Sequence, residues 1–576
     1  MLIRILWVFF VAQASVACMH VKSDQKEAVP NAIGLTQDEK ATIKEKLVEP
    51  KSISPELLYS LLGGEIASQR GYAAMASEFY VNAAKRSKDT GVALRAAQIA
   101  LYNNDIAAAK SAVDILLEDE SLSVQARRLA LTVYLKSSDV DKSLAQIQKL
   151  LQASEIPKRN ALLSIGDVVS RHAHSAIAIK IMDVLVVENV NEAGVYLARS
   201  KIVSSAGVFE QAEADARRTI SLDAAWQAGY IQLAQVLEKK GDTKAALVVL
   251  EGSSEELDVR QLSMAYGQLL AKDGQYSEAK KQFLALANKE PSYSAARFAL
   301  GLMYLRLEDV VRAKETFERL YKGNVFKSKG AFYLGRIERH QENPEEALGW
   351  FKKVERGDSY LDAQVAIAMI HAEAKDFKSA TSVVRRLRNE SPRYVARFYL
   401  LEAELLMGNH QYSDVYALLT EAVNETPHDL SLRYARSIAA TEVDELAEAE
   451  KDLLFVLDKQ PTNANALNAL GYTLASKTSR FKEARQYLTK ALFLRPEDSM
   501  ILDSMGWLNY REGQYEEALV LLEKAYKKMP EGEIAAHLGE TLWVLGRRSE
   551  AKVIWQDALQ RDVDNRYLID VIDRLK

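Results

Sequence analysis

Apolar and small residues recur along most of the chain with a period of about 34 residues. The stretch REGQYEEALVLLEKAYKKMP (511–530) shows the unit: a Gly, an aromatic residue two positions later, Ala518, a second Ala and a closing Pro. The Ala518 position can be followed from Ala76 to Ala551 in 14 steps, with Ser143 and Val415 as its exceptions. The chain is therefore expected to contain fifteen repeats.

A second column of small residues precedes the first by about twelve positions. It contains Gly301, Gly335 and Gly506, and Leu131 is its one large member. Two helices of about a dozen residues approach closely only where side chains are small, so the two columns predict where the helices cross. Prolines at regular intervals are expected to end the second helix of a unit; they are Pro392, Pro427, Pro461, Pro496 and Pro530.

This pattern resembles the tetratricopeptide repeat (TPR), a helix–turn–helix unit of 34 residues. The resemblance covers residues 53–576 and implies an all-α, right-handed superhelical solenoid of about fifteen repeats. The columns are less regular in residues 53–222 than in residues 223–576, so we divide the repeats there. Solenoids of this kind have a concave groove and bind proteins or peptides.

Residues 1–17 have the layout of a secretory signal peptide. Arg4 precedes an apolar run that is too short to span a membrane, and small residues follow it. The only cysteine of the chain, Cys18, comes directly after the expected cleavage point. The segment resembles a bacterial lipobox, which implies that Cys18 carries lipid, although Ser15 stands where the lipobox usually has Leu. The alternatives are cleavage without lipidation and a buried cysteine without a special role.

Residues 18–52 are expected to form a tether between the lipid and the repeats. The segment is polar, contains Pro30 and Pro50, and lacks the apolar residues needed to fold by itself. In the lipoprotein resemblance, Asp after the cysteine signals retention in the inner membrane. Met19 occupies this position, so we expect a lipid-anchored protein of the outer membrane that faces the periplasm.

Composition and motifs argue against catalysis and against nucleic-acid binding. The formal net charge of −4 provides no basic surface for nucleic acid. The sequence lacks the phosphate-binding GxxxxGK motif, the zinc motif HExxH and the nucleophile motif GxSxG. His172 and His174 are two residues apart and therefore point to different faces of a helix. We expect no metal, no cofactor and no enzymatic activity.

The last three repeats carry a sharper resemblance. The segments ALNALGYTLA (466–475), ILDSMGWLNYREG (501–513) and EIAAHLGETLWVLGRRSEA (533–551) are similar to the C-terminal signature of large bacterial TPR lipoproteins of the outer membrane. Some of these lipoproteins are adaptors that bind a periplasmic carboxyl-terminal processing protease and deliver its substrates, often cell-wall hydrolases. The resemblance implies such an adaptor. A scaffold for exopolysaccharide export, pilus assembly or cell-wall synthesis is the alternative.

The partner-binding groove is expected along the first helices of the repeats, beside the small column. Polar and aromatic residues share one stripe there, which favours binding over simple packing. The alternative is that Trp507, Tyr510 and Trp543 pack against the next repeat. The predicted groove residues are Asn468, Tyr472, Asp503, Trp507, Tyr510, Glu540 and Trp543, with Arg336 and Arg339 in a more basic stretch.

Overall fold

The computed structural model describes residues 53–119, 122–257, 259–563 and 565–575. Within these ranges every regular element is a helix. The predicted signal peptide (1–17), Cys18 and the rest of the tether (18–52) lie outside the described residues. The described residues form two compact units, which we call the N-terminal unit (53–326) and the C-terminal unit (327–575) and describe separately.

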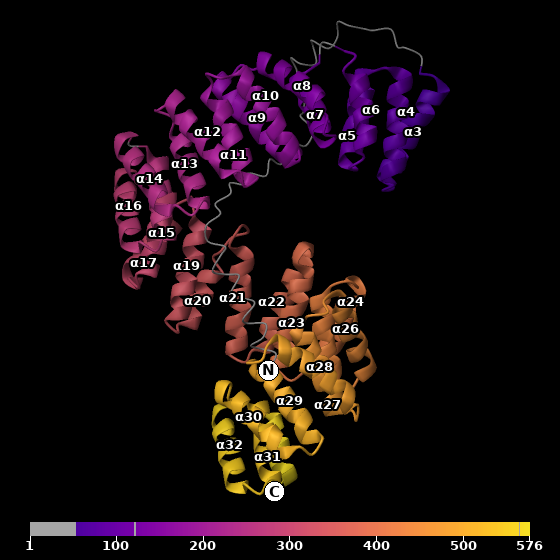
Figure 1. Cartoon of the computed structure of the whole chain (residues 1–576), viewed down its shortest axis with the longest axis vertical. Coiled ribbons are helices and arrows are strands. Elements are labelled where there is room, and N and C mark those ends of the chain that lie inside the picture. Colours follow the sequence, from indigo (N-terminus) through magenta and orange to yellow (C-terminus); the bar gives the residue numbers. More distant parts are fainter. Residues whose placement is uncertain (1–52, 120–121, 258, 564, 576) are drawn as a thin grey trace. The chain divides into compact units, whose positions relative to one another are not determined.

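The N-terminal unit consists of successive helical pairs, drawn from indigo to magenta in Figure 1. The helices are α3 (Pro55–Gln69), α4 (Ala73–Ser87), α5 (Thr90–Tyr102), α6 (Ile106–Leu116), α7 (Val124–Lys136), α8 (Val140–Gln152), α9 (Lys158–His172), α10 (Ser175–Glu188), α11 (Ala193–Ser205), α12 (Phe209–Leu222), α13 (Gln227–Lys239), α14 (Thr243–Leu257), α15 (Arg260–Lys272), α16 (Tyr276–Lys289), α17 (Ser294–Arg306) and α18 (Val310–Lys322).

The C-terminal unit continues the same pairing and ends with a single additional helix. Its elements are α19 (Lys327–His340), α20 (Pro344–Phe351), α21 (Tyr360–Glu373), α22 (Phe377–Glu390), the 3-10 turn η3 (Pro392–Tyr394), α23 (Val395–Gly408), α24 (Tyr412–Glu425), α25 (Leu430–Glu442), α26 (Leu446–Lys459), α27 (Ala464–Lys477), α28 (Phe481–Leu494), α29 (Ser499–Arg511), α30 (Tyr515–Lys528), α31 (Gly532–Val544), α32 (Arg548–Arg561) and α33 (Arg566–Leu575).

The helices α3 to α32 form fifteen consecutive pairs, which confirms the repeat number predicted from the sequence. Each pair packs mainly on itself and on its neighbours in the chain. The division at residue 222 follows the regularity of the sequence pattern, whereas the compact units divide between Phe326 and Lys327. No described helix combines the length and the apolar character needed to cross a membrane.

The small column on the first helix makes room for a large side chain on the second helix. A Cβ atom added to Gly301 would lie 2.8 Å from Cζ of Phe317, and one added to Gly506 would lie 2.7 Å from Cγ of Leu522. Each of these large side chains lies four residues, about one helical turn, after a member of the Ala518 column. The alanines of that column, such as Ala313, are themselves fully buried. The sequence therefore predicted the crossing correctly in these repeats.

One repeat departs from this geometry. A Cβ atom on Gly166 of α9 would overlap Ala198 of α11, the first helix of the next repeat, rather than a residue of its own partner α10. At Gly194 the backbones of α11 and α9 approach so closely that a Cβ atom would overlap the carbonyl group of Arg159. In this repeat the small residue therefore allows close contact between neighbouring repeats. The expectation that it allows close contact within its own helical pair was wrong here.

The prolines end second helices as predicted. Helix α24 ends at Glu425 and Pro427 follows two residues later; α30 ends at Lys528 and Pro530 follows at the same distance. Because proline cannot donate a backbone hydrogen bond and restricts the residue before it, the helix stops and the chain turns into the next repeat.

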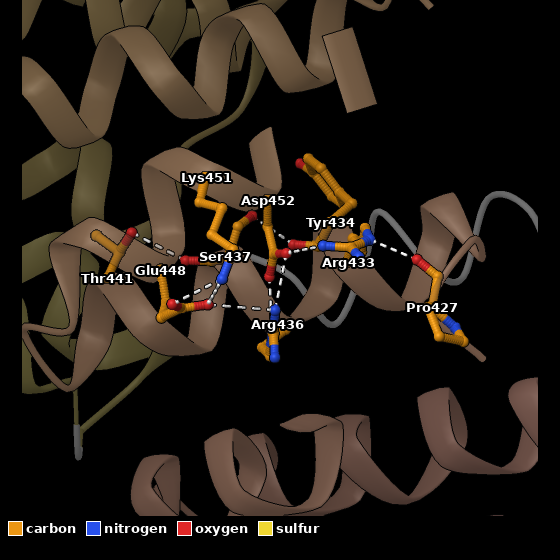
Figure 2. A network of polar contacts seen from close by, with 9 residues as sticks. All are labelled: Pro427, Arg433, Tyr434, Arg436, Ser437, Thr441, Glu448, Lys451 and Asp452. Atoms are coloured by element: carbon orange, nitrogen blue, oxygen red, sulfur yellow. Dashed lines mark hydrogen bonds and ion pairs between the residues drawn. The ribbon is translucent and has the colours of Figure 1, made fainter. Parts of the chain in front are cut away.

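Buried ion pairs join the two helices of certain repeats. Asp452 of α26 is fully buried and accepts hydrogen bonds from Arg436 at 2.6 and 2.8 Å and from Arg433 at 2.7 Å. Figure 2 shows both arginines of α25 converging on this carboxylate. Arg199 and Asp215 form the same bidentate pair in the N-terminal unit with the same 16-residue spacing. These pairs replace part of the apolar contact between helices by charge-assisted hydrogen bonds.

Candidate binding site on the C-terminal repeats

A cavity of about 540 Å³ lies in the C-terminal unit. Its wall consists of α23, α24, the first helices α25, α27, α29 and α31, the start of α33 and the turns beside them. The side chains that line it include Tyr412, Tyr434, Glu442, Asn465, Asn468, Tyr472, Arg495, Asp498, Met500, Glu533, Asp562, Arg566 and Tyr567.

The repeat register explains which side chains face the cavity. Asn465, Met500 and Glu533 each lie six residues before the small column of their own repeat, and all three line the wall. Asn468 and Tyr472 are separated by four residues, so they lie one above the other on α27. Equivalent positions of successive first helices therefore contribute to a shared surface.

The last helix returns to the earlier repeats and closes one side of the cavity. Arg566 forms an ion pair with Glu442 of α25, 124 residues earlier in the chain. The hydroxyl of Tyr567 donates to the same carboxylate at 3.1 Å. The guanidinium group of Arg566 also lies 4.5 Å from the ring centre of Tyr412, within the range of a cation–π contact.

Two of the predicted groove residues, Asn468 and Tyr472, line this cavity. Asn468 is 8% exposed, and its Oδ1 atom has no hydrogen-bond partner among the described residues. The hydroxyl of Tyr472 donates to Oε1 of Glu533 at 2.6 Å. Burial raises the pKa of the Glu533 carboxyl; His537 opposes this shift, and Asp503 adds to it. The cavity thus contains an unused acceptor, Asn468 Oδ1, and a buried carboxyl group that accepts a hydrogen bond from the neutral hydroxyl of Tyr472.

Asp503 and Trp507 instead contact the next repeat. Nδ1 of the buried His537 lies 3.0 Å from Asp503 Oδ1, and the Trp507 ring stacks on the His537 ring at 4.1 Å between centroids. Burial alone would lower the pKa of His537, but the neighbouring carboxylate of Asp503 raises it above the ordinary value. These contacts fit the alternative that Trp507 packs between repeats.

Tyr510 and Glu540 also connect neighbouring repeats. The Tyr510 hydroxyl donates to Glu540 at 2.9 Å, and Arg574 of α33 donates two hydrogen bonds of 2.8 Å to the same carboxylate. Glu540 is buried, so its charge is balanced internally by Arg574. A direct role of Asp503, Trp507, Tyr510 and Glu540 in partner binding stays a prediction.

The remaining predicted residues lie elsewhere. The Trp543 ring is 5.7 Å from the Trp555 ring of α32 and is covered by the guanidinium group of Arg548 at 5.0 Å. Arg336 is exposed on α19 above the Tyr333 ring, and Arg339 pairs with Glu373. The structure therefore does not bring these three predicted residues together with Asn468 and Tyr472.

The sequence reasoning missed Glu442, Glu533, His537, Arg566 and Tyr567. The position six residues before the small column could have revealed Glu533, because Asn465 and Met500 occupy it in the preceding repeats. Nothing in the repeat pattern relates Arg566 to Glu442. Within the described residues, no group of three or more His, Cys, Asp or Glu side chains is arranged to hold a metal ion.

Comparisons with known proteins agree with the repeat architecture. A family model described as "Tetratricopeptide repeat" matches residues 94–155, 265–325, 312–362 and 434–499, and a second one with the same description matches residues 510–570. The TPR repeat-containing protein PA4667 of Pseudomonas aeruginosa is 31% identical over 521 residues, which cover 89% of this chain and 86% of that protein.

Solved structures show only a distant likeness. The Cut9–Hcn1 hetero-tetramer of the APC/C matches with a TM-score of 0.33 and 14% identity, covering 91% of this chain and 90% of the other. TTC0263 of Thermus thermophilus, a TPR protein, matches with a TM-score of 0.29 and 18% identity, covering 31% of this chain and 96% of the other. At these TM-scores the likeness adds nothing to the assignment.

Fifteen consecutive helical pairs define a protein of the helical solenoid class. The chain belongs to the tetratricopeptide repeat family, as its repeat matches and its relative of nearly full length show. Repeats of this family indicate a scaffold for protein–protein interaction, a fold that is typically non-catalytic.

Proposed function

We propose that the chain is a non-enzymatic adaptor anchored by lipid on Cys18 to the outer membrane and facing the periplasm. It binds a carboxyl-terminal processing protease together with the substrates of that protease, such as cell-wall hydrolases. The lipobox-like segment, the C-terminal repeat signature and the protein-binding fold support this proposal. An adaptor raises the effective concentration of a substrate near its enzyme, which requires at least two binding surfaces.

The observation that carries the proposal is an exposed apolar face on α3 in the N-terminal unit. Leu58, Leu62 and Ile66 recur every four residues and are 46%, 54% and 51% exposed. Tyr59, beside them, is 68% exposed. Clustered exposed apolar side chains of this kind are typical of a protein-binding surface. The cavity of the C-terminal unit provides a second candidate surface.

The position of α3 explains how a partner would dock. Helix α5, the first helix of the next repeat, packs against both its own second helix α6 and the second helix of the preceding repeat, α4. No described repeat precedes α3. Terminal repeats of solenoids usually present a polar outer face. Because this face is apolar, an amphipathic helix of the protease can pack on it as a preceding helix would.

The test is capture of partners from detergent-solubilised envelope with the full-length chain as bait. The wild-type chain should recover a serine protease in stoichiometric amount, and Leu62→Glu combined with Ile66→Glu should lose it. Val248→Glu is the matched control, since Val248 of α14 is 67% exposed and lies in the same unit. Undiminished capture by the double variant would show that α3 is not the docking face.

The second candidate function is a scaffold for an envelope assembly or export machine. The solenoid favours it as well, because many repeats can hold several subunits at once. In the same capture experiment, recovery of synthase or secretin subunits in place of a protease would favour the scaffold over the adaptor.

A further inference from the structure

The cavity of the C-terminal unit offers hydrogen-bond acceptors without matching donors. Oδ1 of Asn468 is buried and has no partner among the described residues. Tyr472, one turn later on α27, donates to Oε1 of Glu533, and Asn468 and Glu533 line the same cavity. A buried acceptor without a donor costs free energy, which a ligand that brings N–H groups would recover.

The wall also carries more carboxyl groups than guanidinium groups. Glu442 is already neutralised by Arg566, and Arg495 donates to Asn465 and lies beside Asp498. Among the described residues that line the cavity, in contrast, only the neutral hydroxyl of Tyr472 donates a hydrogen bond to Glu533. Four carboxyl groups line the cavity against two guanidinium groups; the carboxyl groups belong to Glu442, Asp498, Glu533 and Asp562, and the guanidinium groups to Arg495 and Arg566.

The chain itself shows how this wall holds an arginine. The guanidinium group of Arg566 lies 4.5 Å from the Tyr412 ring centre and 5.1 Å from the Tyr567 ring centre. The same group pairs with the Glu442 carboxylate. Tyr472, whose hydroxyl donates to Glu533, brings an aromatic residue and a carboxyl group together elsewhere on the wall. This second combination has no guanidinium group of the chain bound to Glu533.

We propose that this cavity binds an arginine side chain on an extended segment of a substrate protein. The inference rests on the proposed adaptor function, because the segment would belong to a protein delivered to the protease. Glu533 supplies the opposite charge, Asn468 Oδ1 accepts an N–H group, and the Tyr472 ring provides an aromatic surface. A planar guanidinium group satisfies all three at once because it carries five N–H donors and stacks on rings, which the compact ammonium group of lysine does less well.

The experiment uses the full mature chain and a blocked nonapeptide of Gly and Ser with one central arginine, followed by isothermal titration calorimetry. The arginine peptide should bind at millimolar peptide or below. A peptide with citrulline, which keeps the shape of arginine without its charge, should bind at least about tenfold more weakly. No binding of the arginine peptide, equal binding of the citrulline peptide, or stronger binding of a glutamate peptide would each overturn the proposal.

Variants of the chain identify the site. Glu533→Gln removes the charge but can still accept from Tyr472, and it should weaken the arginine peptide about tenfold or more. Glu517→Gln is the matched control, since Glu517 is exposed on α30, and it should leave the affinity unchanged. Circular dichroism and hydrogen exchange of α31 should be the same in both variants. Equal affinities of Glu533→Gln and wild type would contradict the assignment.

Failure of this inference can be told apart from failure of the adaptor function. If the envelope capture recovers the protease but no arginine peptide binds, the cavity has another role and the adaptor function stands. If arginine peptides bind and Glu533→Gln weakens them, but no protease is recovered, the site stands and the adaptor function fails.

Discussion

Gly335 provides a direct test of how the helices within a repeat fit together. It lies on α19 and faces the fully buried ring of Phe351 on α20. The Cβ atom of a Gly335→Ala variant would lie 2.7, 2.8 and 3.0 Å from three ring atoms, Cε1, Cδ1 and Cγ. Carbon atoms prefer separations of roughly 3.5–4.0 Å, so the ring or the helix must move by about 0.5–1 Å.

Two opposing effects set the size of the change. Forcing an additional methyl group into a packed core costs roughly 1–3 kcal/mol. Replacing Gly by Ala inside a helix gains about 1 kcal/mol. We therefore expect a net loss of roughly 0–2 kcal/mol for Gly335→Ala, and a greater loss for Gly335→Leu, which inserts three more carbon atoms.

Gly349→Ala on α20 isolates the steric part. Gly349 belongs to the same repeat, and a Cβ atom added there meets no atom within 4 Å. Only the gain in helix propensity applies, so this variant should be stabilised by about 1 kcal/mol. The difference between Gly349→Ala and Gly335→Ala then reports the overpacking cost of roughly 1–3 kcal/mol.

The assay is hydrogen exchange of the full mature chain, read helix by helix, together with urea unfolding. Because repeats contact mainly their neighbours, Gly335→Ala should raise exchange in α19 to α22 and leave α3 to α16 unchanged. Exchange that rises uniformly across all fifteen repeats would refute the solenoid argument. Equal stability of Gly335→Ala and Gly349→Ala would refute the packing argument.

Three further predictions concern the anchor, a titrating carboxyl and a buried ion pair. Native protein should partition into the detergent phase of Triton X-114 and Cys18→Ser should not; native protein found wholly in the aqueous phase excludes lipidation. Burial raises the pKa of Glu404 from 4.5 to about 7, so the folded state holds the proton more tightly than the unfolded state. Stability should therefore fall by up to about 3 kcal/mol as pH rises from about 4.5 to about 7, and Glu404→Gln should remove this slope in urea titrations. Arg436→Met removes two hydrogen bonds from Asp452 and leaves the one from Arg433, so it should cost less than the roughly 3–5 kcal/mol of an unpaired buried charge; the double variant Arg433→Met with Arg436→Met should reach that range in urea unfolding, and equal stability of the single and double variants would contradict the ion-pair argument.

The sequence alone was sufficient to predict the repeat architecture. The glycine and the aromatic ring that fills the space beside it, such as Gly301 and Phe317, are separated by few residues, and so are Pro427 and the end of α24. Both the glycine–ring contact and the proline after the second helix recur with the same period in other repeats. A solenoid repeat contacts itself and its neighbours, so a pattern of 34 residues contains both partners of most contacts. The exception at Gly166 shows the limit of this reasoning, because a small residue does not reveal which helix uses the space.

The site depended on the tertiary structure. Spacing along a helix placed Asn468 and Trp507 on the stripe beside the small column, but it did not say what lies opposite each of them. Only the structure shows that Trp507 faces His537 of the next repeat, while Asn468 faces a cavity. The contact of Arg566 with Glu442 arises because small rotations between successive repeats add up until α33 meets α25. The repeat pattern does not contain the sum of these rotations, since each one is set by the packing of side chains between two particular repeats.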